Sequence, residues 1–122
     1  MSLPLYKIIT KADWQIAQRT GFVPLSAVDA RDGFVHLSTI AQYIATANLY
    51  FSADSRPLVI EFNSDQLGGE LRWEWSEQRQ ADFPHLYTDQ LPVNAADAIV
   101  ELVVTDQGFA VCSRTPLTDC ID

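Results

Sequence analysis

The only two histidines of the chain sit in matching short motifs. His36 lies in FVHLS and His85 in FPHLY, and a hydroxyl follows each ring by two residues, Ser38 and Tyr87. Imidazole is the side chain best suited to accept or donate a proton near neutral pH. If both segments are extended, each presents its imidazole and its hydroxyl on one face. The motifs therefore predict a small polar cleft that holds a ligand between two strands.

Core histidines are the alternative interpretation of both rings. A strand that carries His36 presents Val35 and Leu37 on its other face, so the ring lies in an apolar stretch. A buried imidazole bonded to backbone carbonyls would only stabilise the fold. The strand is expected to run directly into a helix, however, and such junctions offer unpaired backbone N–H groups to anions. The position therefore leaves both interpretations open.

The segment ELRWEWS supplies a third group of polar side chains. Its strict alternation predicts a strand with Leu71, Trp73 and Trp75 on the core side and Arg72 and Glu74 on the face toward the cleft. Burial of an indole stabilises a fold by roughly 2–3 kcal/mol, so the tryptophans should set the orientation. An arginine and a carboxylate there are suited to bind an anion and orient a hydroxyl. The alternative is a solvated strand face with a cross-strand ion pair.

The net charge of −8 limits the classes of partner. It argues against a broad basic surface for bulk nucleic acid or anionic membranes, but not against a small anionic ligand held by a few arginines. Residues 33–53 carry no Lys, Arg, Asp or Glu and have about the length of a membrane span. Polar residues interrupt this stretch, so no membrane span is expected.

Several motifs of known chemistry are absent from the sequence. It has no Walker loop, no G-x-G-x-x-G, no G-x-S-x-G and no HExxH, and its histidines lack i, i+4 spacing, so no metal site is expected. Cys112 and Cys120 match no zinc spacing. Two spare thiols, with no leader pattern at the start of the sequence, suggest a reducing cytoplasm.

Two main helices are expected, over residues 12–20 and 39–50. Both show apolar residues at helical spacing, and Thr10 and Thr39 offer capping-box starts. Residues 22–32 contain a proline and three charges and are expected to be irregular.

The remaining pattern predicts an α+β fold with six or seven strands. The strands are expected at LYKIIT, GFVHLS, PLVIEF, ELRWEWS and FPHLY and in a C-terminal hairpin that turns near residues 106–108. One domain is expected over residues 1–122, with a weakly ordered tail at 113–122.

The order of these motifs resembles one small bacterial family. LYKIIT, GFVHLST followed by TANLYF, PLVIEF, LRWE and FPHLY are similar to the domain-of-unknown-function family nine hundred and fifty-two, over about residues 5–104. The pair GF-x-H-x-S and FPH-x-Y carries the resemblance. That family is similar to the ADP-ribosyltransferase and RNA 2′-phosphotransferase superfamily, which implies a split, curved, largely antiparallel sheet. It also implies NAD or an ADP-ribosyl group as substrate.

The resemblance implies roles for the polar residues already described. His36 matches the second position of the superfamily's triad, beside the nicotinamide pocket. The implied catalytic residues are His36, Glu74 and His85, and the implied ligand-binding residues are Lys7, Ser38, Arg72 and Tyr87. The sequence departs from the family pattern at Lys7, where the family often has histidine, and after Tyr87, where TDQLPV replaces Gly-Pro-Leu.

Two functions therefore follow from the sequence. The first is an enzyme that transfers or hydrolyses an ADP-ribosyl or related nucleotide group. The second is a module of the same fold that binds a nucleotide-like molecule or a protein without turnover, which the lysine at position 7 favours. The oligomeric state is left open.

Overall fold

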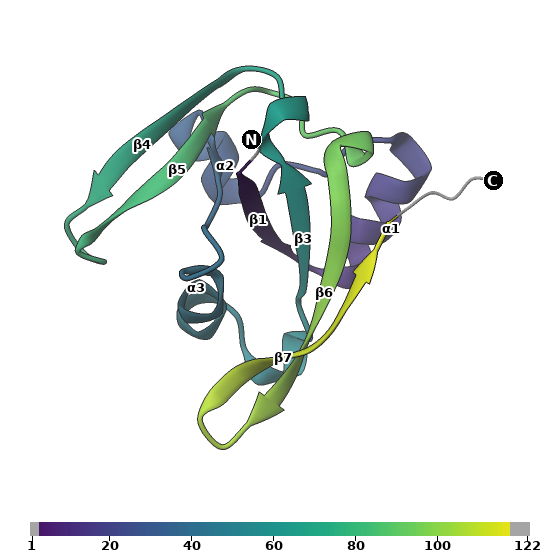
Figure 1. The fold of residues 1–122 in the computed structure, drawn as a ribbon, viewed down its shortest axis with the longest axis vertical. Coiled ribbons are helices and arrows are strands. Elements are labelled where there is room, and N and C mark those ends of the chain that lie inside the picture. The colour runs from purple at the N-terminus through teal and green to yellow at the C-terminus, as the bar shows by residue number, and fades with distance from the viewer. Residues whose placement is uncertain (1–2, 118–122) are drawn as a thin grey trace.

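Two antiparallel sheets meet along one edge in the computed structural model, which describes residues 3–117 (Figure 1). The larger sheet has the strand order β1-β3-β6-β7, and its strands are β1 (Pro4–Ile9), β3 (Leu58–Asn63), β6 (Ala96–Thr105) and β7 (Gly108–Pro116). The smaller has the order β2-β5-β4, with β2 (Val35–His36), β4 (Glu70–Ser76) and β5 (Ala81–Tyr87). Short 3-10 turns cover Ala53–Ser55, Ser64–Gln66 and Val93–Ala95. The expected α+β class with largely antiparallel strands is confirmed.

A two-way backbone bridge joins the sheets. Tyr6 N donates to Ser38 O at 2.8 Å, and Ser38 N donates back to Tyr6 O at 2.9 Å. Ser38 follows β2, so the bridge places the His36 strand beside the open edge of β1.

Successive side chains of β1 pack in two different apolar clusters, one on each face of the large sheet. Leu5 and Ile9 pack in the cluster that includes Trp14 and the apolar residues of the small sheet. Tyr6 and Ile8 pack on the other face, in a cluster with Tyr43 and Ala47. Strand β3 lies between β1 and β6 and is buried over its first five residues, as the run PLVIEF predicts.

The described part of the chain, residues 3–117, contains three α-helices where two were expected. Helix α1 (Lys11–Thr20) agrees with its prediction, and Thr10 Oγ1 accepts from Asp13 N at 3.0 Å. Helix α3 (Tyr43–Tyr50) begins four residues later than expected. The segment before it is a turn in which the Gln42 side chain accepts from Thr39 N at 3.0 Å.

The additional helix α2 (Ala27–Asp32) lies in the segment that was expected to be irregular. Ser26 Oγ accepts from Asp29 N at 3.0 Å, and the Asp29 carboxylate accepts from Ser26 N at 3.3 Å, which completes a capping box. Gly33 ends the helix with φ of 84°.

The predicted burial of the two tryptophans of β4 is wrong. Trp73 and Trp75 are 45% and 57% exposed. The alternation itself holds, because Leu71 packs against the core on the same face. The hairpin of β4 and β5 projects past the body of the protein, so its outer half has no core to cover the indoles (Figure 1).

The C-terminal hairpin turns between Thr105 and Gly108, as predicted. Residues 113–116, at the start of the tail that was expected to be weakly ordered, continue β7. Arg114 anchors this end of the strand through two bonds to the Glu61 carboxylate, at 2.7 and 3.0 Å. Cys120 and residues 118–122 lie outside the described residues. Within residues 3–117, the helices are too short or too polar to span a membrane.

Candidate functional site

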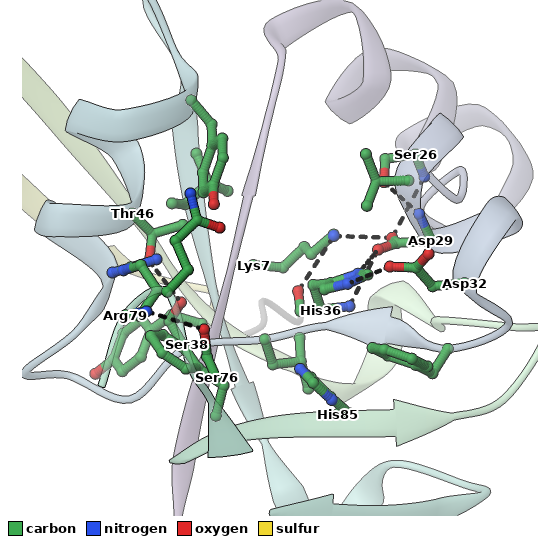
Figure 2. Close-up of a pocket in the computed structure, with 18 of the residues that line it drawn as sticks. Lys7, Ser26, Asp29, Asp32, His36, Ser38, Thr46, Ser76, Arg79 and His85 are labelled. Carbon is green, nitrogen blue, oxygen red and sulfur yellow. Dashed lines mark hydrogen bonds and ion pairs between the residues drawn. The ribbon is translucent and has the colours of Figure 1, made fainter. Parts of the chain in front are cut away.

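A cleft of about 830 Å³ opens between the small sheet, α2 and α3 (Figure 2). Its polar lining comes from β1, α2, β2, α3, β4, β5 and the segments next to them. It includes Lys7, Ser26, Asp29, Arg31, Asp32, His36, Ser38, Thr46, Ser76, Gln78, Arg79 and His85. Aromatic side chains, among them Phe34, Trp75 and Phe83, supply much of the rest. A cleft of this size accommodates a ligand as large as a nucleotide.

Asp29 organises one end of the cleft and is almost fully buried, with 1% exposure. Its Oδ2 accepts from Lys7 Nζ at 2.8 Å, and its Oδ1 accepts from both the backbone N and the ring Nδ1 of His36, at 3.0 and 2.8 Å. Burial acts to raise the pKa of the Asp29 carboxyl. The bond from His36 and the positive charge of Lys7 outweigh burial and hold that pKa well below its usual range.

The His36 ring lies between two carboxylates. Its Nδ1 faces Asp29, and its Nε2 lies 3.0 Å from Asp32 Oδ2. Ionised carboxylates only accept hydrogen bonds, so both bonds form together only on a doubly protonated ring. Asp32 also binds Arg31 at 2.8 Å, and this hydrogen bond is the main cause of the lowered pKa of the Asp32 carboxyl.

His85 lies directly opposite His36 in the β2–β5 pair. Their ring centroids are 5.2 Å apart, and Phe34 stacks on His85 at 4.2 Å. Glu74 Oε1 lies 2.7 Å from His85 Nδ1 and accepts from Tyr87 OH at 2.8 Å. The bond from His85, followed by the bond from Tyr87, lowers the pKa of the Glu74 carboxyl. Bonding to Glu74 in turn raises the pKa of the Tyr87 hydroxyl.

The seven residues singled out from the sequence divide into two sets. Lys7, His36, Ser38 and His85 line the cleft. Tyr87 and one or both of Arg72 and Glu74 were also expected at the cleft. All three lie beside its lining, on the same face of the small sheet. Arg72 binds Glu70 at 3.0 Å and lies 4.5 Å above the Tyr87 ring. Glu74 reaches the cleft only through His85.

Asp29, Asp32, Phe34 and Arg79 are the main residues of this site that sequence analysis missed. The motif SAVD is a capping-box signal that could have revealed α2 and, with it, Asp29. The three-residue spacing of Asp29 and Asp32 then places both carboxylates on one side of that helix. Nothing local marks Arg79, because its cleft partners come from α3 and β5.

Comparison with known proteins agrees with this fold. The sequence model of DUF952, described as a protein of unknown function, matches residues 8–101. The chain belongs to the DUF952 family. A crystal structure of protein CC0527 from Caulobacter crescentus is 34% identical, with a TM-score of 0.75 over 93% of this chain and 92% of that one. A solution NMR structure of CC0527 is 35% identical, with a TM-score of 0.72 over 87% and 90% of the two chains. A search among curated proteins returns no match.

Proposed function

We propose that the cleft binds a nucleotide of the NAD or ADP-ribose type and transfers or hydrolyses its ADP-ribosyl group. The observation that carries the proposal is the pair of imidazoles at the cleft, 5.2 Å apart, each bonded through Nδ1 to a carboxylate. The division of the strands into two antiparallel sheets supports it, since the ADP-ribosyltransferase resemblance implies a split sheet. Enzymes gather oriented, titratable side chains where chemistry occurs.

His85 acts as the general base in this proposal. A neutral ring that donates from Nδ1 to Glu74 presents Nε2 as an acceptor, and Nε2 has no partner among residues 3–117. An acceptor hydroxyl or a water attacks the ribose C1′ and gives its proton to Nε2, while nicotinamide leaves with the electron pair of the broken glycosidic bond. Glu74 and Tyr87 do not touch the substrate and serve as positioning residues.

His36 meets the ribose in the same proposal, and Ser38 lines the cleft next to it. Ser38 is 4% exposed, and its hydroxyl lies at the junction of the two sheets. For His36 Nε2 to bind a ribose hydroxyl, Asp32 must release it. Lys7 donates to Asp29 and to His36 O at 2.8 and 3.2 Å, so it positions Asp29 and the β2 backbone instead of contacting the ligand.

The test is incubation of the full chain with NAD, followed by mass spectrometry for nicotinamide and ADP-ribose. We expect nicotinamide to accumulate with the wild type and to fall by about a hundredfold or more in His85→Gln, which loses the base. Arg19→Gln, an exposed change in α1 away from the cleft, should match the wild type. No release by the wild type between pH 5 and 9 would refute the enzymatic function.

Binding without turnover is the second candidate function. The buried contacts of Lys7 with Asp29, and the occupation of both His36 nitrogens, favour it because they leave fewer groups available for chemistry. Calorimetry with ADP-ribose separates the two functions. Binding of ADP-ribose without any nicotinamide release would identify a binding module.

A further inference from the structure

Charge pairing in the cleft leaves one side chain uncompensated. Apart from the histidines, the charged residues of the lining are Lys7, Asp29, Arg31, Asp32 and Arg79. Lys7 pairs with Asp29 and Arg31 with Asp32, each at 2.8 Å. Within residues 3–117, no carboxylate lies within ion-pairing distance of the Arg79 guanidinium. In a chain with a net charge of −8, the cleft thus keeps an unpaired cation.

The Arg79 side chain is partly buried and held in place. Its guanidinium donates to Thr46 Oγ1 at 3.1 Å, and the same group lies 4.6 Å above the Phe83 ring. The backbone N of Arg79 donates to Ser76 Oγ at 3.2 Å, which fixes the turn that carries it. Only one side-chain hydrogen bond is made within residues 3–117, so most N–H donors of the guanidinium remain available in a fixed orientation.

A hydroxyl lies next to this cation. Ser38 Oγ has one partner within the described chain, Thr46 Oγ1, at 3.4 Å. Thr46 Oγ1 donates to Gln42 O, so the Ser38 hydroxyl is the donor in this long contact, and its proton can turn to a bound ligand instead. Figure 2 places Arg79, Thr46, Ser38 and Ser76 together, across the cleft from Lys7, Asp29 and Asp32. A fixed guanidinium with a neighbouring hydroxyl is suited to bind a phosphate group, because charge-assisted hydrogen bonds of this kind are strong and directional.

We infer that Arg79, together with the Ser38 hydroxyl, forms a phosphate-binding subsite that takes the diphosphate of a nucleotide-type ligand. The inference rests on the proposed function for the location of the ligand, and it assigns the phosphate end of that ligand. It also replaces the role first expected of Arg72, which lies outside the cleft and is paired with Glu70. The histidines are then left to the ribose end.

The test is calorimetric titration of the full chain with inorganic pyrophosphate, ADP and adenosine. We expect pyrophosphate and ADP to bind the wild type and to bind Arg79→Gln about ten- to a hundredfold more weakly. Arg79→Lys, which keeps the charge without the planar fork, should lie between the two. Adenosine should bind Arg79→Gln and the wild type alike. Arg19→Gln, with the same loss of charge at an exposed position, should leave all affinities unchanged.

Thr46→Val separates phosphate binding from a purely structural role of Arg79. It removes the hydrogen bond between them but leaves the guanidinium, so pyrophosphate should still bind with an affinity closer to wild type than that of Arg79→Gln. Equal losses in the two variants, or wild-type pyrophosphate affinity in Arg79→Gln, would overturn the subsite. If Arg79→Gln does not fold, the Arg79 Nε resonance of the wild type should shift on titration with pyrophosphate, and an unmoved resonance would overturn it.

The outcomes also separate this inference from the proposed function. Pyrophosphate binding that depends on Arg79, without NAD cleavage, leaves the subsite standing and refutes the enzyme. NAD cleavage with an unchanged KM in Arg79→Gln supports the enzyme and refutes the subsite. Failure of the wild type to bind pyrophosphate or ADP at millimolar concentration refutes the subsite directly.

Discussion

Asp29 is the residue on which the histidine end of the cleft depends. Its carboxylate holds Lys7, the ring and backbone of His36, and the backbone N of Ser26. Lys7 is 7% exposed, so its ammonium relies on Asp29 for compensation of its charge. The same carboxylate therefore sets the orientation of His36 and makes a buried lysine tolerable.

Asp29→Asn should be strongly destabilising. The substitution leaves the Lys7 ammonium buried without a counter-charge, and loss of one partner of a buried ion pair costs about 3–5 kcal/mol. Urea denaturation at pH 7 measures this loss. Asp32→Asn is the matched control, because Asp32 contacts the same histidine from a more exposed position, and its loss should be much smaller. Similar losses in the two variants would show that Asp29 has no special structural role.

The loss of stability at acid pH should depend on Asp29 as well. The pKa of Asp29 is held below its ordinary value of 3.8 in the folded protein, so the unfolded chain takes up the proton first as the pH falls. The stabilisation by Asp29 is then fully present above about pH 5 and is lost as the pH drops through 3.8 toward the folded pKa. In Asp29→Asn, the urea midpoint should decrease less than in the wild type as the pH falls from 5 to 3. An equally steep decrease in the variant would contradict this assignment.

The hairpin of β4 and β5 is the element that positions His85. The backbone is tightly constrained at Gly69, directly before β4. Gly69 has φ of +81°, and a Cβ built there would clash with Tyr87 O. No neighbouring atom lies within 4 Å of the equivalent position at Gly68. These adjacent glycines thus differ in what a methyl group would meet, which gives a matched pair of variants.

Gly69→Ala should destabilise the protein by about 1–3 kcal/mol, because it combines a positive φ with a backbone clash. Gly68→Ala should change stability by less than about 0.5 kcal/mol. Thermal or urea unfolding of both variants measures the difference. Because the clash falls on Tyr87, Gly69→Ala should also disturb the bond from Tyr87 to Glu74, visible as a shift of the His85 ring resonances. Equal stability of the two variants would show that the Gly69 backbone is freer than the structure indicates.

At the element level, regular alternation and helical periodicity predicted the strands and the two longer helices. The alternation in ELRWEWS gave the correct strand and placed Arg72 and Glu74 on the face of His85. It could not give the exposure of Trp73 and Trp75, because exposure depends on how far the hairpin projects past the core. Helix α2 was missed because a six-residue helix shows little apolar periodicity, and only its capping box is readable.

The cleft itself is a property of the whole molecule. His36 and His85 are 49 positions apart in the numbering, and their cross-strand contact follows from the β2–β5 pairing, which no local pattern encodes. Their matching motifs still pointed to a shared location. The acidic partners and the Arg79 end depend on α2, α3 and the hairpin turn meeting around that pair, which required the structure.

The two sheets should differ in local stability. Strand β3 is paired on both sides and buried over five residues, whereas β4 is an edge strand in which no residue is buried. Buried, doubly paired amides open only with global unfolding, and edge amides open locally at a much lower free energy. Amide hydrogen exchange should therefore be slowest in residues 58–62 and fastest among the strands in residues 73–76.

Contacts from Gln42 to Asp82 O and from Arg79 to Thr46 connect this hairpin to α3. Pyrophosphate bound at Arg79 should therefore slow exchange in residues 73–82 and leave residues 58–62 unchanged. Equal protection of β3 and β4 in the free protein would contradict the view that the small sheet opens independently of the large one.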